Sequence, residues 1–358
     1  MLKRVLAALF VLCHVEGNDK PRFGKRAASL RRRLALSQAG LAEKLGVSAQ
    51  AVSKWETGAA LPDIELLLEL SRLYGVSVNE LLEDNGLLSC IANRPFEEKD
   101  GIAYFVPPAS GPEELQWERD MRAEGWIARN WRDAWDQPGG WAETAYGRNI
   151  AGERSKPNDQ RIGRWIAQRG GVIFDIGSGP GGGYMPFILR ADPAARIIVS
   201  DLSHTVVEEW KRFLDAEVDS PDLYYAALDF CGIPFQSGTV DVISDHSGIL
   251  NCIGDQSAAL RECYRVLKPG GVLVSLNSFV TKEALNALPE SARQALLREF
   301  PSMTADLYED TVLAGFRKTD SEVTGTWTTE EGESGLADLA RSLGVTVRFT
   351  EYVRFCEK

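Results

Sequence analysis

The sequence predicts two folds in series: an all-α five-helix domain, then a doubly wound α/β domain with a Rossmann-like sheet. The first observation is charge, because residues 20–60 carry nine Lys/Arg and two acids while residues 61–358 sum to −18. The second is the helical spacing of apolar residues in five short segments between residues 22 and 85. The third is a glycine-rich turn after a buried strand at residues 171–183, followed by alternating strand and helix patterns.

The composition is that of an ordinary globular protein of two or three domains. The chain has 358 residues, of which 44% are hydrophobic and 25% charged, and this excludes collagen-like, disulfide-scaffold and disordered classes. Its net charge of −11 argues against a surface that coats nucleic acid. With six scattered cysteines, no CxxC pair and three histidines, we expect reduced thiols and no metal site.

Residues 1–20 form an N-terminal extension before the first domain. Lys3 and Arg4 precede an apolar run over residues 5–13, as in a signal peptide, but this run is too short to span a membrane. The residues before Cys13 are not small, and the basic segment over residues 20–60 follows. We therefore expect a cytoplasmic protein without a membrane partner.

The five helices of the basic domain, residues 21–86, have recognisable boundaries. Ser37 and Ser48 are N-cap residues for the second and third helices, and Gly46 suits the left-handed turn between them. The expected helices cover residues 23–34, 38–45, 49–56, 64–74 and 79–83. Two helices joined by a tight glycine turn are the arrangement that places the second helix in the major groove of DNA.

The run from Ser37 to Gly58 closely resembles the Cro/phage-repressor (XRE) family of helix-turn-helix proteins, and the resemblance covers residues 22–85. It implies a double-stranded DNA partner and a phosphate contact by Gln38. It also implies a DNA-facing surface on the third helix, made of Ser48, Ala49, Gln50, Ser53 and Lys54.

The chemistry of these side chains suggests which contacts each can make with DNA. Gln50 can pair with adenine and Lys54 with guanine, whereas Ala49 offers only a methyl contact. The run Arg31–Arg33 is expected to meet phosphates, and a homodimer to read a two-fold site. The alternative is a helical bundle that binds protein, which the basic charge of this segment disfavours.

Residues 87–115 read as a linker, and residues 116–358 as the second domain with a Trp-rich start. The linker is suggested by its Asn, Gly, Pro and acidic residues. A helix is expected over residues 118–136, with Trp126, Trp131 and Trp135 on one apolar face. Two interpretations remain open: a helix that covers the domain, or a lid over substrate that includes Tyr146 and Arg148.

The larger domain alternates strands and helices, so its ligand is expected across the carboxyl ends of its first strands. Gly177, Gly179 and Gly182 form the G-x-G-x-x-G pattern, with Asp201 24 residues past the first glycine. Alone, this pattern fits a nicotinamide or flavin dinucleotide equally well. The expected strands are residues 171–176, 197–200, 223–227, 240–244 and 272–276, with helices at 206–214 and 258–267.

Three neighbouring features favour another ligand: Asp175 before the first glycine, the run Asp229–Phe235, and the turn Leu267–Gly271. Together they resemble the class I S-adenosylmethionine-dependent methyltransferase family, over roughly residues 116–358. The resemblance implies S-adenosylmethionine as cofactor.

Each matching position then has an implied role. Asp175 helps hold the ligand's amino group, Asp201 accepts the ribose hydroxyls, and Asp229 bonds the adenine. The other cofactor-binding residues are the glycine loop, which passes the methionine part and ribose, and apolar neighbours of the acids: Gly177, Ser178, Gly179, Gly181, Leu202 and Phe230.

Asp245 and His246 follow the fourth strand and are the candidate catalytic residues. His246 is the better general base, because few residue types titrate near neutral pH. The alternative is a loop histidine packed against the cofactor. Asn251 and Cys252 are weaker neighbours.

The methyl acceptor is expected to be a small molecule or a protein group. The Asp/Asn-Pro-Pro-Tyr signature and the Pro-Cys nucleophile of DNA-methylating enzymes do not occur, and the acidic domain repels phosphate. Two hypotheses stay open: a transcription regulator fused to an active methyltransferase, or a non-catalytic regulator that senses S-adenosylmethionine. Selectivity is expected from residues 116–149 and from the insert 278–326.

Overall fold

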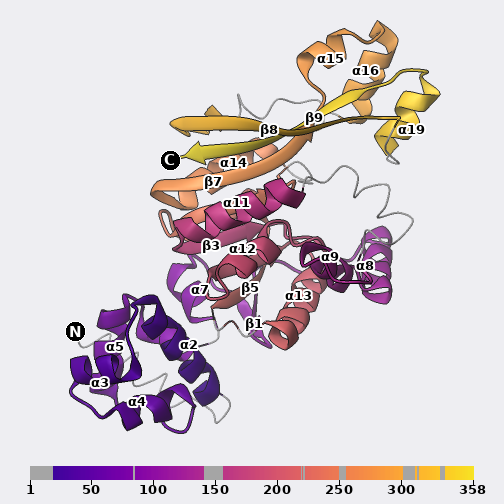
Figure 1. Cartoon of the computed structure of the whole chain (residues 1–358). Coiled ribbons are helices and arrows are strands. Elements are labelled where there is room, and N and C mark those ends of the chain that lie inside the picture. Colours follow the sequence, from indigo (N-terminus) through magenta and orange to yellow (C-terminus); the bar gives the residue numbers. More distant parts are fainter. Residues whose placement is uncertain are drawn as a thin grey trace.

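The computed structural model has a helical domain at one end and a large sheet with flanking helices beyond it (Figure 1). The structure describes residues 19–83, 85–140, 156–218, 220, 222–249, 255–300, 311–312, 314–330 and 335–358. The expectations for the extension up to residue 18, and for Tyr146, Arg148, Asn251 and Cys252, lie outside these residues.

The helical domain confirms the expected five helices. Ser37 accepts a hydrogen bond from the Gly40 N–H and Ser48 from the Ala51 N–H, and Gly46 takes a φ of +65°. Its apolar residues share one core that includes Phe23, Leu41 and Trp55. The helices are α2 (Asp19–Arg33), α3 (Gln38–Leu45), α4 (Ala49–Glu56), α5 (Ile64–Tyr74) and α6 (Val78–Leu82).

The second domain is built on a nine-stranded sheet in the order β1-β2-β5-β4-β3-β6-β7-β9-β8. Neighbouring strands from β2 to β7 are parallel, whereas β1, β9 and β8 add antiparallel pairs at the two sides. The strand order reverses at β3. In doubly wound sheets the ligand binds in a crevice at such a reversal, so we expect the ligand beside the carboxyl end of β3. The strands are β1 (Glu97–Lys99), β2 (Ile102–Tyr104), β3 (Val172–Ile176), β4 (Arg196–Asp201), β5 (Leu223–Ala227), β6 (Val240–His246), β7 (Leu267–Phe279), β8 (Lys318–Thr328) and β9 (Arg348–Glu357). The turn expected at residues 268–271 is part of β7.

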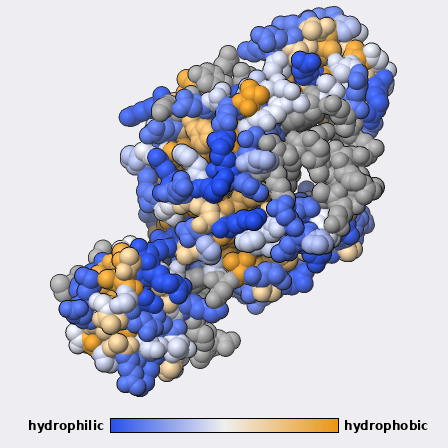
Figure 2. All heavy atoms as spheres, in the orientation of Figure 1, coloured by the Kyte–Doolittle hydropathy of each residue, from blue (hydrophilic) through white to orange (hydrophobic). Residues whose placement is uncertain are grey.

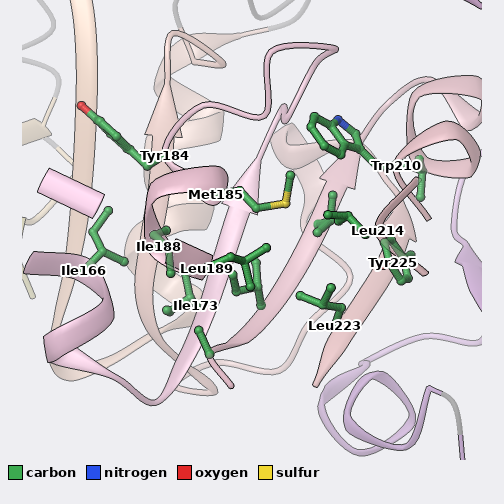
Figure 3. Packing of buried hydrophobic residues seen from close by; sticks show 14 of the residues in the cluster. Ile166, Ile173, Tyr184, Met185, Ile188, Leu189, Trp210, Leu214, Leu223 and Tyr225 are labelled. Carbon is green, nitrogen blue, oxygen red and sulfur yellow. The ribbon is translucent and has the colours of Figure 1, made fainter. Parts of the chain in front are cut away.

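Helices cover both faces of this sheet. α11 (Lys156–Arg169), α12 (Met185–Ala191) and α13 (His204–Glu217) bury apolar side chains against one face, where Ile188 and Leu189 lie beside Ile173 (Figure 3). Gly163 lets α11 approach α12, since a Cβ there would lie 2.5 Å from the Phe187 Cβ. α14 (Gln256–Val266) and α7 (Gly86–Ile91) share the core on the other face.

Part of the expected linker belongs to the folded domain. Leu87, Leu88 and Ile91 of α7 are buried in the sheet's core, and β1 and β2 extend the sheet beside β5. The Gln236 N–H donates to the Ile91 carbonyl at 2.7 Å. The linker prediction over residues 87–115 is therefore wrong here, because short apolar runs between polar residues do not reveal a long-range strand partner.

The Trp-rich segment forms two helices rather than one. α8 (Pro112–Glu124) and α9 (Trp126–Ala134) meet at Gly125, whose φ is +64°. Trp131 is 6% exposed, stacks on Trp135 at 5.4 Å and meets the edge of Phe213 on α13 at 5.6 Å. This packing agrees with the interpretation of a covering helix. The insert begins with two helices, α15 (Lys282–Asn286) and α16 (Glu290–Glu299), and α19 (Gly335–Ser342) follows β8.

A buried ionic contact joins the helical domain to the amino ends of two strands. Asp222, directly before β5, is 1% exposed and lies 3.6 Å from Arg26 and 2.9 Å from Arg33 of α2. Arg26 is 2% exposed and also lies over the ring of Tyr224 at 5.4 Å. Arg196, the first residue of β4, pairs with Glu80 at 3.3 Å.

These pairs correct one expectation about the Arg31–Arg33 run. Arg33 faces Asp222, and Arg31 pairs with Glu56 at 2.6 Å, where the pair raises the pKa of its guanidinium. Two of the three arginines therefore pair with carboxylates of the protein itself. Arg32 is exposed.

The described residues contain no helix that is long and apolar enough to cross a membrane. Within the same ranges, no group of three or more His, Cys, Asp or Glu side chains is arranged to hold a metal ion. Hydrophilic side chains dominate the face of the molecule that Figure 2 shows.

Candidate functional site

The predicted DNA-facing residues lie largely on the surface of α4. Ser48, Ala49, Gln50 and Lys54 are exposed and Ser53 is half-buried. Val52 and Trp55, three residues apart on one face of the helix, are buried, so they fix the face that α4 turns outward. Figure 1 shows α3 and α4 at the end of the molecule away from the sheet.

Gln38 has an internal partner. Its amide nitrogen donates to the Glu56 carboxylate at 2.8 Å, and Arg31 donates to the same carboxylate. Glu56 therefore ties the start of α3 and the end of α2 to the end of α4. This holds the two helices of the motif in a fixed relation.

The glycine turn after β3 requires glycine for its backbone shape. Gly177, Gly179, Gly182 and Gly183 have φ values of +58°, +50°, +65° and +47°. A Cβ at Gly177 would meet the Gly248 Cα at 3.2 Å, so two backbone segments approach closely here. The Ser178 N–H donates to the Ser200 carbonyl at 2.8 Å, and this hydrogen bond joins the turn to β4. Gly181, later in the turn, is half-buried.

Asp175 lies beneath this turn near the end of β3 and is 2% exposed. Its carboxylate accepts hydrogen bonds from the hydroxyls of Ser178 at 2.5 Å and Ser244 at 2.8 Å. Burial raises the pKa of the Asp175 carboxyl to about 7, although both hydroxyls and the nearby His246 act in the opposite direction.

Asp201 ends β4 and faces the same turn. It accepts backbone hydrogen bonds from the N–H groups of Gly179 and Ser203, both at 2.9 Å. Burial raises its pKa, and the negative charge of Glu118 adds a smaller contribution. Leu202 beside it is 41% exposed, which is unusual for a leucine at the carboxyl end of a buried strand.

Asp229 and Phe230 follow β5 at the next position along the sheet. Asp229 is exposed and caps the short helix η2 (Phe230–Gly232) through the Cys231 N–H at 2.8 Å. The Phe230 ring lies near Gly177, where an added Cβ would be 3.5 Å from its Cε1. The three predicted acids therefore lie at the carboxyl ends of β3, β4 and β5.

The two candidate catalytic residues have different surroundings. Asp245 is fully buried and accepts hydrogen bonds from the Ser275 hydroxyl at 2.5 Å and the Ile249 N–H at 3.0 Å. Burial raises its pKa. This arrangement fixes the loop after β6 and does not support the catalytic role predicted for Asp245. His246 is 13% exposed and lies on the opposite face, with Asp175 and α11.

Sequence reasoning missed three side chains that shape this site. Trp210 donates from Nε1 to the Gly179 carbonyl at 2.7 Å, and Glu118 accepts hydrogen bonds from the hydroxyls of Ser203 and Thr205. Asp159 of α11 lies 3.7 Å from His246 Nε2. No local pattern marks them, since each reaches the site from a helix and not from the strand ends that carry the recognised motifs.

The residues present fit the cofactor that the sequence resemblance implies. Asp175 is a buried carboxylate that suits an ammonium group, and Asp201 is a half-buried carboxylate that suits a ribose diol. Exposed Leu202 and half-buried Phe230 offer apolar surface to a base. Gly177 and Gly179 carry no side chains and so permit close approach of a ligand to the backbone of the turn.

Comparison with known families identifies both domains. Residues 28–81 match the helix-turn-helix family model, and residues 174–275 match that of a methyltransferase domain. The chain is 37% identical over 113 residues to the ubiquinone/menaquinone biosynthesis C-methyltransferase UbiE of Cereibacter sphaeroides, which covers 31% of this chain and 44% of that protein. An uncharacterised chloroplastic methyltransferase of Arabidopsis thaliana is 31% identical over 135 residues, or 36% of this chain and 37% of that one. The chain thus spans less than half the length of these relatives.

Solved structures with a similar arrangement include two methyltransferases. A putative methyltransferase from Bacillus halodurans matches with a TM-score of 0.43 and 15% identity over 56% of this chain and 99% of that one. Phosphoethanolamine N-methyltransferase 2 of Haemonchus contortus matches with a TM-score of 0.43 and 17% identity over 67% of this chain and 58% of that one. From the two family models, the chain carries an XRE-type helix-turn-helix domain followed by a class I S-adenosylmethionine-dependent methyltransferase domain.

Proposed function

We propose that this protein is a cytoplasmic DNA-binding regulator whose second domain transfers a methyl group from S-adenosylmethionine to a small molecule or protein group, not to DNA bases. The observation that carries the proposal is the grouping of Asp175, Asp201 and Asp229 at three adjacent strand ends around the glycine turn. Asp175 holds the ammonium, Asp201 the ribose and Asp229 the adenine. The cofactor, when bound, supplies an electrophilic methyl group.

Isothermal titration of S-adenosylmethionine into the full chain tests this proposal, with NAD titrated in parallel. We expect micromolar binding of S-adenosylmethionine and no heat with NAD. Binding of NAD alone would replace the methyltransferase proposal with a dinucleotide enzyme. An absence of binding by both ligands would leave the domain without the proposed cofactor.

The helix-turn-helix domain is proposed to bind a two-fold DNA site as a homodimer through exposed side chains of α4. In the double variant Gln50→Ala/Lys54→Ala, we expect selection of an operator over random DNA to fall by roughly 30- to 20,000-fold, since each of the two lost base contacts supplies about 1–3 kcal/mol. Competition binding on selected and scrambled duplexes measures this loss.

The matched control is Arg72→Ala, which removes an exposed positive charge from α5, outside the motif. It should weaken both duplexes equally or leave both unchanged. If the double variant and Arg72→Ala changed selectivity equally, α4 would not be the helix that reads the bases. Sedimentation of the free and DNA-bound chain tests the dimer.

The proposed contact of Asp175 with an ammonium group makes cofactor affinity depend on pH. The pKa of this carboxyl is raised to about 7, so the free protein holds a proton there below that pH. Binding must release the proton, and affinity should therefore rise with pH up to about 7, by at most about tenfold per unit. Titration calorimetry from acidic to neutral pH measures the slope. Asp175→Asn, which has no proton to release, should bind more weakly and without this slope.

A second candidate function is a non-catalytic sensor, favoured by the buried contacts between α2 and the sheet. The helical domain contacts the amino ends of β4 and β5 through ion pairs of Arg196 and Asp222. The predicted cofactor-binding residues Asp201 and Asp229 lie at or just beyond the carboxyl ends of the same two strands. A regulator in which cofactor binding alters DNA affinity needs such a physical connection. Operator affinity with and without S-adenosylmethionine, together with methyl transfer across a panel of metabolites, separates the two functions.

A further inference from the structure

His246 and Asp159 form a buried pair at the edge of the candidate site. His246 is the last residue of β6, and Asp159 lies in the first turn of α11. The His246 Nε2 and Asp159 Oδ1 atoms are 3.7 Å apart, and the two side chains are 13% and 5% exposed. α11 runs into β3, so its first turn lies towards the carboxyl edge of the sheet, where the predicted cofactor residues gather.

The neighbours of the histidine leave its ring little freedom. The Tyr184 ring meets it edge-on with centroids 5.1 Å apart, and the Gly183 backbone lies so close that an added Cβ would be 2.8 Å from the His246 Cβ. Within the described part of the chain, His246 Nε2 is enclosed and has no hydrogen-bond partner. Among the described residues, the charged or titratable groups around it are Asp159 from α11, Asp175 from β3 and Tyr184 beside α12.

We propose that Asp159 is a positioning residue that holds the proton of His246 on Nε2, so that Nδ1 serves as the base for the methyl acceptor. The inference rests on the proposed methyltransferase function and goes beyond it by naming a second residue and an acceptor class. A carboxylate that orients the far nitrogen of a histidine fixes which nitrogen keeps a lone pair. The same carboxylate stabilises the ring when it becomes charged.

The proton balance defines which acceptors need this pair. As the acceptor's nucleophilic atom bonds to the methyl carbon, the methyl–sulfur bond breaks and its electron pair stays on sulfur. The proton of the acceptor passes to His246 Nδ1, and the positive charge that leaves the sulfonium ends on the imidazolium beside Asp159. A hydroxyl or a carbon acid requires such a base, whereas a thiolate or an unprotonated amine can attack without one.

The test uses proton and nitrogen NMR of the full chain with ¹⁵N-labelled histidine, at alkaline pH where the rings are neutral. The chain has only three histidines, and His246→Gln assigns the signal of interest. We expect a downfield Nε2–H signal in the wild type that is lost in Asp159→Ala. Asp159→Asn, which keeps an acceptor oxygen, should restore the signal with a smaller downfield shift.

The matched control is Gln160→Ala on the same helix, which should leave the His246 signal unchanged. S-adenosylhomocysteine serves as the probe of location, and its binding should move the His246 signals while Asp159→Ala leaves its affinity unchanged. An unchanged Nε2–H signal in Asp159→Ala, or bound S-adenosylhomocysteine that leaves His246 unmoved, overturns the inference. Failure of the wild type to bind S-adenosylhomocysteine contradicts the proposed function instead, and the inference, which requires the acceptor beside a bound cofactor, is then withdrawn with it.

Discussion

Asp222→Ala is expected to lower the stability of the folded chain by about 3 kcal/mol, because the buried guanidinium of Arg26 keeps its hydrogen bonds to the Glu80 and Glu83 carbonyls but loses its carboxylate. Arg26 is 2% exposed and Asp222 1%, so water cannot replace the lost partner. The hydroxyl of Ser29, which donates to Asp222 at 3.3 Å, loses its acceptor in the same variant. Urea unfolding followed by tryptophan fluorescence measures the loss, with Trp55 reporting on the helical domain.

Arg33→Ala is the internal comparison for this prediction. Arg33 pairs with the same carboxylate at 2.9 Å but is 29% exposed, and such a pair contributes about 1 kcal/mol or less. The two variants should therefore differ clearly although they break the same cluster. Equal small losses would show that Asp222 does not hold the domains together. Two separate unfolding transitions in Asp222→Ala alone would show that the cluster couples the domains.

Asp201→Ala is expected to weaken S-adenosylmethionine binding by roughly 100-fold or more. A carboxylate that accepts two ribose hydroxyls makes two charged hydrogen bonds, each of about 1.5–3 kcal/mol. The variant also frees the N–H groups of Gly179 and Ser203, which Asp201 holds at 2.9 Å, so the glycine turn loses its anchor to β4. Isothermal titration of wild type and variant gives the ratio directly.

Asp192→Ala is the matched control, since Asp192 lies in the turn at the other end of β4. It also accepts a backbone hydrogen bond, from the Ala194 N–H at 3.0 Å. The Asp192→Ala substitution removes an aspartate side chain that caps a turn but leaves the candidate site unchanged. The affinity for S-adenosylmethionine should therefore equal that of the wild type. Equal affinity in wild type and Asp201→Ala would remove Asp201 from the proposed ribose contact.

The sequence predicted much of the fold because its signals are local. Serine caps, Gly46 and apolar spacing gave α3, α4 and α5 their boundaries, and buried apolar runs gave the strands from β3 to β7. Local signals failed where a segment has a distant partner. β2 pairs with β5 across more than 100 residues of chain, β1 pairs with β2, and the polar residues around both strands resemble a linker.

In the candidate site, too, local signals predicted some residues, and contacts between distant segments placed the others. The glycine pattern and the acids at the strand ends could be predicted from the sequence. A parallel sheet brings the carboxyl ends of its strands to one edge, so residues that follow successive strands lie near one another. The sequence alone thus determined that the chain carries a DNA-binding helix pair and a cofactor-type glycine turn. Tertiary structure decided that Asp245 is buried with Ser275, that Asp159 faces His246, and that Asp222 binds Arg26. Charged side chains find such partners through packing between distant segments, and no spacing rule within one segment records that packing.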